Sequence, residues 1–382
     1  MIESVLSSLF TLENLLWINV GLAGGIMVGA LPGLTGTMAM ALLLPLTYGL
    51  ASIPGVMLLL GVYCGSIYGG SITAILINTP GTPASAATSL DGYPMAQKGH
   101  GLKALHVALS ASTIGGLFSC AVLLFAAPPI ASFALKFGPA EYFALALFGL
   151  TIIASVGGKS QIKGLLMGFV GLLISCIGID PMDGVSRFTF GINRMEGGID
   201  TIPVLIGLFA ITEIMAKARD MNKATGTAVK VEKEKTRFRD VLKYKMVLLK
   251  SSILGVFIGA VPGTGAAISS FLAYNEAKRT SKHPEEYGHG SEEAVVASES
   301  ANNAVTGATL IPLGIPGDTN TAVLLGALTM QGIAAGPQLF TQHGEWVYTI
   351  MLGLIAVNIF MYLQGRVFIR GFVNITRVPT ST

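Results

Sequence analysis

Small polar side chains gather around two Pro-Gly pairs in each half of this chain of 382 residues. In the first half the pairs lie within segments 29–36 and 78–82, and in the second half within 259–265 and 314–320. Segment 259–265 repeats the pattern of 29–36 with one residue fewer. Hydroxyl and amide groups coordinate an anion or a cation without carrying charge themselves. Their recurrence at matched positions therefore predicts a binding site for a solute.

The candidate site consists of the Pro-Gly pairs and the small or polar residues beside them. The residues that we assign to substrate or ion binding are Pro32, Gly33, Thr35, Gly36, Asn78, Thr79, Pro80, Gly81, Thr82, Pro262, Gly263, Thr264, Gly265, Asn302, Asn303, Pro316, Gly317, Asp318, Thr319 and Asn320. An alternative stays open for each residue taken singly, because Ser and Thr also cap half-helices and bond across membrane helices.

Asp318 is the one acidic residue placed at a break. Three roles are open to its carboxylate: a ligand for Na⁺, a carrier of a proton, or the N-cap of a helix that starts at Thr319. Thr82 occupies the matching place in the first half, so the two halves are not chemically equivalent. Asp91, which precedes Gly-Tyr-Pro, is expected in a turn.

The composition places these breaks inside a membrane. Hydrophobic residues make up 52% of the chain and charged residues only 12%, against about 25% charged in a soluble domain. Proline removes a backbone donor, and an unpaired backbone group in lipid costs several kcal/mol. Such breaks are tolerated only where they face protein, water or a solute. Half-helix N-termini suit carboxylates and unwound carbonyls suit Na⁺, so the pattern predicts a secondary transporter.

The expected fold is an all-α polytopic membrane protein with two inverted-topology repeats, Pro-Gly-broken helices and re-entrant hairpins. We expect a first repeat over 1–104, connecting transmembrane helices over 105–216, a basic cytoplasmic loop over 217–250, a second repeat over 251–343, and a final helix with the C-terminal tail over 344–382. An odd number of crossings in each repeat requires one of its two breaks to be a re-entrant hairpin. The sequence does not indicate which.

Basic residues predict the orientation. Eleven of the 24 Lys and Arg residues lie in 217–250, which places this loop in the cytoplasm. Counting spans backward puts Lys98 and Lys103 on the same side and the N-terminus in the periplasm. The two repeats then enter the membrane from opposite faces. Because the basic residues are concentrated in one short loop, nucleic acid is not an expected partner.

Three segments resemble the large membrane subunit of tripartite tricarboxylate transporters, the TctA family. They are YGGSITAILINTPGT at 68–82, DGYPMA at 91–96 and IPLGIPGD at 311–318. The resemblance covers essentially the whole chain. Family members usually continue for several helices beyond the point where this chain stops, so the usual C-terminal helices are expected to be missing.

This resemblance implies a multi-pass protein of the bacterial inner membrane that imports citrate or related carboxylates. The implied partners are a small integral membrane subunit, a periplasmic solute-binding protein, the carboxylate substrate and membrane lipid. A gradient of Na⁺ or H⁺ would drive uptake without any other cofactor. The chain has no phosphate-binding G-x-x-x-x-G-K-[ST] motif, which agrees with this implication.

Other functions remain as alternatives. A self-sufficient carboxylate transporter would work without a binding protein, and a channel would need a continuous pore. Residues 314–318 also resemble the Gly-x-Gly-Asp motif of intramembrane aspartyl proteases. That chemistry needs two carboxylates at one site, and no second aspartate lies in a neighbouring apolar span. We therefore expect no enzymatic activity.

Overall fold

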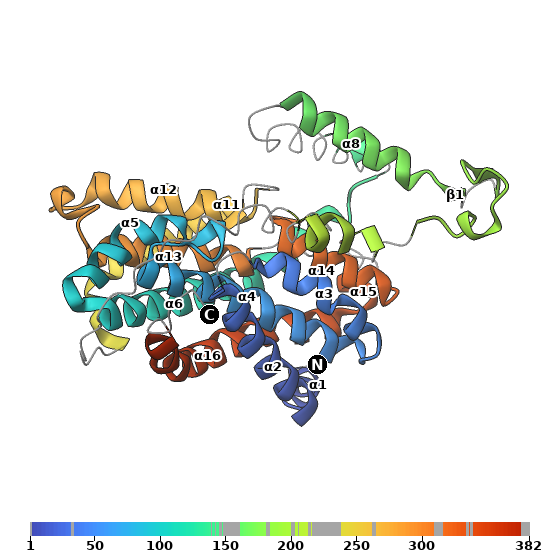
Figure 1. Ribbon diagram of the computed structural model, residues 1–382. Coiled ribbons are helices and arrows are strands. Elements are labelled where there is room, and N and C mark those ends of the chain that lie inside the picture. The colour runs from blue at the N-terminus through green and yellow to red at the C-terminus, as the bar shows by residue number, and fades with distance from the viewer. Residues whose placement is uncertain are drawn as a thin grey trace.

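A computed structural model shows a bundle built almost entirely of helices (Figure 1). The structure describes residues 2–31, 34–138, 140–141, 143–144, 147, 161–180, 184–199, 203–204, 206–212, 215, 238–261, 265–308, 316–333, 336 and 339–375. Within these ranges the only sheet has two strands of two residues each. The predicted all-α class is confirmed.

The described α-helices are α1 (Ile2–Leu9), α2 (Leu12–Gly29), α3 (Gly36–Tyr48), α4 (Ser52–Ile77), α5 (Ala86–Met95), α6 (Gly101–Ala134), α8 (Gln161–Ser175), α11 (Lys245–Gly259), α12 (Gly265–Thr280), α13 (Glu292–Gly307), α14 (Thr319–Met330), α15 (Leu339–Gln342) and α16 (Gly344–Ile375). The short 3-10 and π-helical segments are η1 (Pro83–Ser85), η2 (Ala96–His100), η3 (Asn193–Met195), η4 (Ile206–Ile211), η6 (Phe238–Tyr244) and η7 (Pro284–Glu286), and the strands are β1 (Gly178–Ile179) and β2 (Ser186–Arg187).

Several helices are long and apolar enough to cross a membrane. Among the described residues these are Leu12–Gly29, Ser52–Ile77, the continuous run Pro83–Phe133, and Gly344–Ile369. Their length and composition match the roughly 20 apolar residues that one crossing requires. The chain is thus a multi-pass membrane protein, as predicted. The connecting helices expected over 105–216 lie partly outside the described residues.

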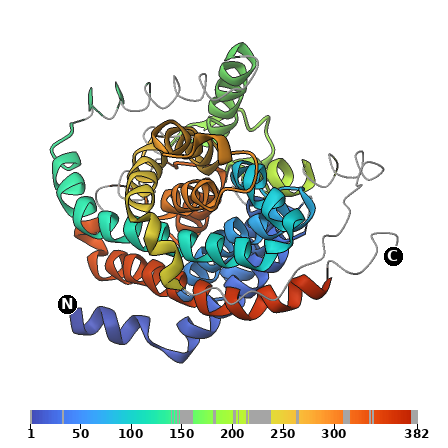
Figure 2. The ribbon, with the colours of Figure 1, turned by 90° about the vertical axis from the view of Figure 1, so that its left-hand side faces the viewer.

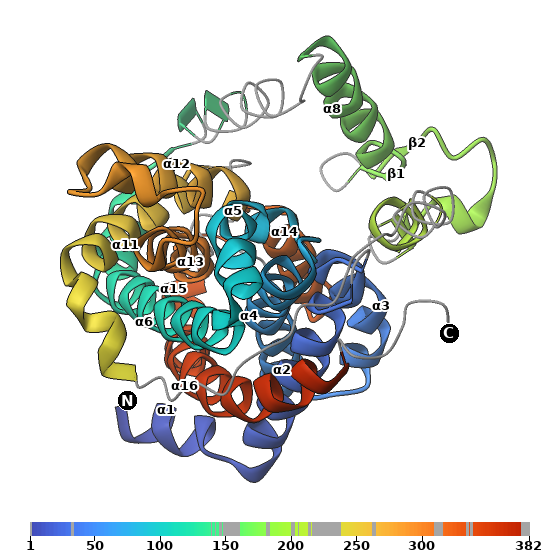
Figure 3. The same ribbon diagram turned by 60° about the vertical axis from the view of Figure 1, so that its left-hand side comes forward.

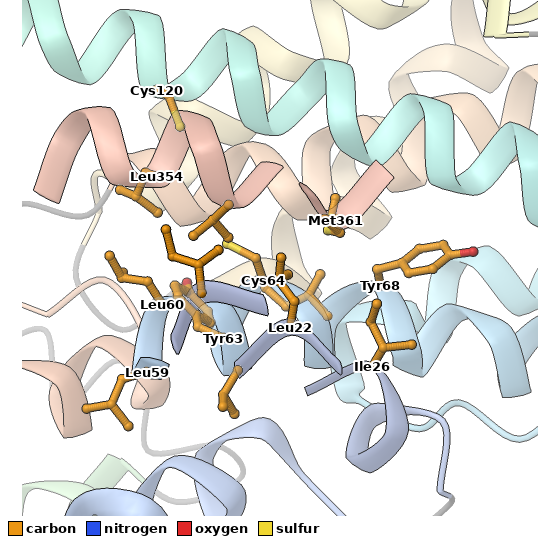
Figure 4. Packing of buried hydrophobic residues seen from close by; sticks show 14 of the residues in the cluster. Leu22, Ile26, Leu59, Leu60, Tyr63, Cys64, Tyr68, Cys120, Leu354 and Met361 are labelled. Carbon is orange, nitrogen blue, oxygen red and sulfur yellow. The ribbon is translucent and has the colours of Figure 1, made fainter. Parts of the chain in front are cut away.

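The core is centred on α4, which is buried along nearly its whole length. Figure 4 shows Tyr63 and Cys64 of this helix among Leu22 of α2 and Leu354 of α16. Helices α6 and α16 pack against α4 and against each other. In Figure 2 these two long helices, in teal and red, run beside both halves of the bundle. By contrast, α8 and the β1–β2 hairpin lie apart from the bundle (Figure 3).

The first break in each half is a re-entrant hairpin. Gly25 of α2 lies against Val62 of α4. Four residues later, Gly29 lies against Ser66. Because residue numbers rise together along both helices, α2 and α4 run parallel. Helix α3 between them must therefore run back, so the direction of the chain reverses between α2 and α3.

The second half repeats this arrangement. Gly255 of α11 lies against Ala301 of α13, which makes Ala301 the equivalent of Val62. Gly259 then lies against Val305. Helices α11 and α13 are therefore parallel, and α12 returns between them. The small residues allow close approach of the backbones, as is typical of membrane helices.

The second break interrupts a helix that then continues in the same direction. After α4 the chain steps back, and the Gly81 N–H donates to the Gly70 carbonyl at 3.2 Å. Helix α5 then advances beside α4 again, because Gly92 lies against Ile75. The hairpin that the sequence could not assign is therefore the first break, and the second break is an interrupted crossing.

The two halves run antiparallel. Toward one end, Thr88 of α5 bonds Ser298 of α13 at 3.2 Å, and the next turn of α5 reaches the residues just before α13. At the other end, Gln331 after α14 lies beside Gly55 near the start of α4. Each half contacts the other through matching elements. Helix α3 of the first half packs against α14 of the second, and α12 of the second half packs against η1 and α5 of the first. Reciprocal contacts of this kind indicate a two-fold relation between the halves.

The boundaries of the expected basic loop differ in detail from the observed helices. Segment η6 and the start of α11 at Lys245 fall within the range 217–250. Residues 217–237 lie outside the described part. Helix α6 begins at Gly101, close to the predicted end of the first repeat.

Candidate functional site

Two helix N-termini, one from each half, meet beside α4. Thr37, in the first turn of α3, donates its hydroxyl to Asn320 Oδ1 at 2.7 Å. The same hydroxyl lies 2.9 Å from Thr319 Oγ1, in the first turn of α14. The positive ends of two helix dipoles and several hydroxyl and amide groups therefore converge. Thr319 and Asn320, which the sequence assigned to the site, are brought together here.

Asp318 joins this cluster as the N-cap of α14. Its Oδ1 accepts the Thr321 N–H at 2.8 Å, and the Asp318 N–H donates to the Thr321 hydroxyl oxygen at 3.0 Å, which completes a capping box. Its Oδ2 accepts the Tyr63 hydroxyl from α4 at 2.7 Å. The structure thus contains the capping geometry that was one of the three predicted roles. No second carboxylate bonds Asp318 among the described residues, so the contacts differ from those of a two-carboxylate protease site.

The matching break in the first half has the same local construction. Thr82 and Ser85 form a capping box at the start of η1. The tip of α12 faces this break, where Ala84, Ala266 and Val305 form a small apolar cluster. Gly265 begins α12 with φ +66°, a conformation that favours glycine. Each interrupted crossing therefore meets the hairpin tip of the opposite half.

Gly81 and Gly317 make equivalent close contacts. A side chain on Gly81 would overlap the carbonyl oxygen of Gly29, at the end of α2. A side chain on Gly317 would overlap the carbonyl oxygen of Gly259, at the end of α11. In both halves the glycine of the second Pro-Gly pair therefore packs against the last turn of the helix that precedes the first pair. This matched contact ties the two breaks of a half into one site.

The remaining predicted residues take local structural positions. Thr35 is the N-cap of α3 and accepts the Met38 N–H at 3.2 Å, and Gly36 follows it against Ser66. Asn78 is the left-handed C-cap of α4 with φ 53°, and Thr79 beside it is exposed. Five predicted site residues lie outside the described part of the chain: Pro32, Gly33, Pro262, Gly263 and Thr264. Pro80 and Pro316 are described and directly precede the close-contact glycines.

Asn302 and Asn303 lie inside α13 and are both fully buried. Asn303 donates to the Ser112 carbonyl at 2.8 Å and to Asn358 Oδ1 at 3.0 Å. Within the described ranges, the Asn302 amide has no hydrogen-bond partner on either atom. Since Ala301 is equivalent to Val62, Asn302 is equivalent to Tyr63, which contacts the break of the opposite half. A buried amide without partners at this position is suited to a polar ligand.

Sequence reasoning missed Glu299, a fully buried acid in α13. Its carboxylate accepts hydroxyl hydrogen bonds from Ser71 at 2.6 Å, Thr88 at 2.5 Å and Ser112 at 2.6 Å. The available signal was its place within the apolar segment 294–315, because an ionisable group at membrane depth is a functional candidate. Glu299 lies in the helix before the second break, whereas the Pro-Gly pattern marks only the break itself.

The turn expected at Asp91 is wrong. Asp91 lies inside α5 and is 1% exposed. Its carboxylate joins α5 to the connection that precedes α13. It accepts hydrogen bonds from the Tyr274 hydroxyl at 2.8 Å and from the backbone N–H groups of Gly288, Gly290 and Ser291 at 2.9, 2.8 and 2.7 Å. Only tertiary structure supplies these donors, which explains why local sequence suggested a turn.

Basic residues gather at this same end of the bundle. Glu292, at the start of α13, pairs with Lys103 of α6 and with Lys243 of η6, the latter at 2.7 Å. Burial raises the pKa of Glu292, but hydrogen bonds from the two lysines outweigh burial and hold the pKa below its usual value. Lys98 donates to the His289 carbonyl at 2.6 Å. The residues predicted to share the cytoplasmic side thus lie together.

Comparison with known proteins gives the family. The profile of the tripartite tricarboxylate transporter TctA family matches residues 15–382, nearly the whole chain. The chain belongs to the TctA family. The expected resemblance is confirmed, and the family is one of transporters, which fits the expectation of a non-enzyme.

Two proteins of Agrobacterium vitis are similar to this TctA member. An uncharacterized 52.8 kDa protein in the TAR-I ttuC' 3' region is 38% identical over 369 residues, which cover 96% of this chain and 74% of that protein. An uncharacterized protein in the TAR-II ttuC' 3' region is 34% identical over 128 residues, or 33% of this chain and 53% of that protein. No solved structure matches.

Proposed function

We propose that this TctA member imports citrate-like tricarboxylates or related carboxylates across the bacterial inner membrane, driven by a gradient of Na⁺ or H⁺. It receives the substrate from a periplasmic binding protein and works with a small integral membrane subunit. The observation that carries the proposal is the meeting of the α3 and α14 N-termini, one from each antiparallel half, at Thr37, Thr319 and Asn320.

The chemistry of this meeting point suits an anionic substrate. Helix N-termini present free N–H groups and partial positive charge, which favour carboxylates. The hydroxyls of Thr37 and Thr319 and the amide of Asn320 add neutral donors. Antiparallel halves with broken helices are the architecture of alternating-access carriers.

Asp318 is the residue that we assign to the coupling ion. Its carboxylate lies directly before Thr319, so a cation bound there would neutralise charge beside the substrate. Tyr63 and Thr321 hold both carboxylate oxygens in place. Thr82 at the equivalent position carries no charge, so one ion of this kind is expected per chain.

The proposed orientation places the N-terminus in the periplasm and loop 217–250 in the cytoplasm. The clustering of Lys98, Lys103 and Lys243 at one end of the bundle supports this orientation through the positive-inside rule. The tip of the α2–α3 hairpin then approaches the membrane centre from the periplasm, and that of α11–α12 approaches it from the cytoplasm.

The test is uptake of labelled citrate into proteoliposomes that contain the chain and the small subunit. Uptake is measured with a Na⁺ gradient, a pH gradient or neither, with and without the binding protein. We expect accumulation only with a gradient and the binding protein. Uptake that does not depend on the binding protein would indicate a self-sufficient carrier, and no uptake of any di- or tricarboxylate under either gradient would overturn the proposal.

A further inference from the structure

Glu299 is an acidic group that the proposed site does not use. It lies in the middle of α13, is fully buried, and has no cationic partner in the part of the chain that the structure describes. An unpaired carboxylate ion in the membrane interior is costly, and such residues are retained where they function. Glu299 therefore needs an explanation beyond packing.

The groups around Glu299 are suited to a change of protonation. All three of its partners, Ser71, Thr88 and Ser112, are hydroxyls. A hydroxyl donates to a carboxylate and accepts from a carboxylic acid by rotation about one bond. The charged and neutral forms of Glu299 therefore both find partners without movement of the backbone. A fixed donor such as a backbone N–H would satisfy only the charged form.

The same contacts favour a proton over a metal ion at this position. The hydroxyl oxygens lie 2.5–2.6 Å from the carboxylate oxygens, which are the lengths of charge-assisted O–H···O bonds. Two of these hydroxyls approach Oε1 and one approaches Oε2. Both oxygens are thus already occupied by hydrogen-bond donors.

The position of Glu299 connects it with both halves of the protein. Glu299 belongs to the second half, whereas Ser71 and Thr88 come from α4 and α5 of the first. Ser112 comes from α6, which follows the first half. A change of charge on Glu299 therefore alters the hydrogen bonds that join the two halves. In an alternating-access carrier this contact is expected to differ between the outward- and inward-facing states.

Other titratable groups lie on the elements packed around α13. On α4 they are Tyr63, Cys64 and Tyr68, on α5 Asp91 and Tyr93, on α6 Lys103, His106 and Cys120, on α11 Lys245 and Lys250, on α12 Tyr274, Glu276, Lys278 and Arg279, on η6 Arg239, Asp240, Lys243 and Tyr244, and on α13 itself Glu292 and Glu293. Asp91 and Glu292 are held by the partners described above. Tyr68 precedes Ser71 by one turn, and its buried hydroxyl has no hydrogen-bond partner among the described residues, which makes it a candidate for a proton relay.

We propose that Glu299 binds and releases a proton in each transport cycle. One proton from water adds to a carboxylate oxygen, and the resulting acid donates its O–H to a neighbouring hydroxyl. Loss of the same proton on the other side of the membrane restores the carboxylate. The inference rests on the proposed function, because it requires gradient-driven transport, and it makes a proton at least one of the coupled ions.

The experiment compares wild type with Glu299→Gln in proteoliposomes that contain the full complex. Three quantities are measured: exchange of labelled substrate without a gradient, accumulation driven by a pH gradient, and substrate-coupled proton entry reported by an entrapped dye. Wild type should acidify the interior during uptake. Glu299→Gln should keep exchange but lose proton-driven accumulation by at least about fivefold, the lower range of coupling between two ligands.

Glu292→Gln is the matched control, because it removes a carboxylate from the same helix at a surface ion pair. It should retain proton coupling. Ser112→Ala keeps Glu299 and removes the hydroxyl that donates to Oε2, so it should shift the pH dependence of uptake while exchange at the optimum is retained. If Glu299→Gln does not fold, the pH dependence of Ser112→Ala and the proton signal of wild type test the proposed protonation of Glu299.

The outcomes separate this inference from the proposed function. Net substrate uptake by wild type without any proton entry would overturn the role of Glu299 while carboxylate transport stands. Proton-driven accumulation that survives in Glu299→Gln would do the same. Absence of all carboxylate exchange in wild type would overturn the proposed function and this inference with it.

Discussion

At the scale of single residues, Asp318 combines a structural and a proposed ionic role in one carboxylate. Oδ1 caps α14 and Oδ2 accepts from Tyr63, so both oxygens are fixed in position. A residue that caps a helix is conformationally restrained before any ligand arrives. This restraint lowers the entropic cost of binding a cation at that point.

Two substitutions separate the roles of Asp318. Asparagine caps helices about as well as aspartate, so Asp318→Asn should keep thermal stability while changing the ion dependence of uptake. Alanine removes the cap, so Asp318→Ala should lose about 1 kcal/mol of stability as well. Thermal unfolding in detergent and citrate uptake against Na⁺ and pH check both. Unchanged Na⁺ and pH dependence in Asp318→Asn would exclude Asp318 from ion coupling.

Asp91 joins the two halves through four donors, and we expect its loss to be severe. Asp91→Asn keeps the size of the side chain, but its NH₂ group would replace Oδ2, which accepts the Gly288 N–H and the Tyr274 hydroxyl, so the variant should lose about 2–4 kcal/mol. Tyr274→Phe removes only the hydroxyl donor and should cost about 1 kcal/mol. Thermal unfolding of both variants measures the difference. Equal stability of Asp91→Asn and wild type would show that these hydrogen bonds contribute nothing.

Glu292 gives a prediction about pH. Its pKa is lower in the folded protein, so its ion pairs stabilise the fold above the ordinary carboxyl pKa of about 4.3 and this contribution is lost as pH falls through the folded value. Glu292→Gln should therefore be less stable than wild type at pH 7, by about 1 kcal/mol or less, and equally stable at strongly acidic pH. Unfolding temperatures over a pH series test this. A difference that persists unchanged in acid would contradict it.

At the scale of elements, each half is a helical hairpin beside an interrupted helix, and glycine contacts hold the hairpin and the interrupted helix together. Gly81→Ala and Gly317→Ala should each disrupt this packing, because the new methyl group would overlap a backbone carbonyl that cannot rotate away. Loss of more than about 3 kcal/mol or failure to fold is expected from overpacking. Yield and unfolding temperature of the purified protein measure the effect.

Gly24→Ala is the control for these substitutions. Gly24 lies in α2, and a side chain there would meet no atom within 4 Å. Alanine should be tolerated or stabilise the helix by about 0.5–1 kcal/mol, because glycine weakens helix interiors. If Gly81→Ala behaved like Gly24→Ala, the closure of the second break onto α2 would be wrong.

The sequence predicted those features that repeat along the chain. The Pro-Gly pairs marked the helix ends at 29–36 and 259–265, and Asp318 was recognised as a possible N-cap because that signal is local. Which break turns back was not predictable, because it depends on whether Gly25 meets Val62 from a parallel or an antiparallel helix. Glu299 and Asp91 were missed or misread for the same reason. Their partners are brought to them only by the packing of the two halves.

At the scale of the whole molecule, two antiparallel halves exchange contacts at their breaks. Each hairpin tip faces the interrupted helix of the other half, through α3 with α14 and α12 with η1. A solute bound between them would contact both halves at once. Movement of one half relative to the other would then open the same site toward opposite faces, which is the basis of alternating access.

This arrangement predicts opposite accessibility of two exposed positions. The end of α3 at Tyr48 lies beside the start of α4, whereas Lys278 near the end of α12 lies toward the end that holds Glu292. With the proposed orientation, Tyr48→Cys should react with a membrane-impermeant maleimide added to intact spheroplasts. Lys278→Cys should react only after the membrane is opened. The exposed native Cys176 must first be replaced by serine, while Cys64 and Cys120 are buried and serve as unreactive internal controls.

The labelling pattern tests the relation of the halves independently of transport. If both cysteines reacted from the same side, Tyr48 and Lys278 would share a face of the membrane and the two hairpins could not enter from opposite sides. If the pattern were reversed, the antiparallel relation would hold but the chain would be inserted the other way round. In that case the basic cluster at Lys98, Lys103 and Lys243 would face the periplasm, contrary to the positive-inside rule. The antiparallel relation follows from contacts within the fold, whereas the absolute orientation follows from charge, so the two results discriminate between separate physical causes.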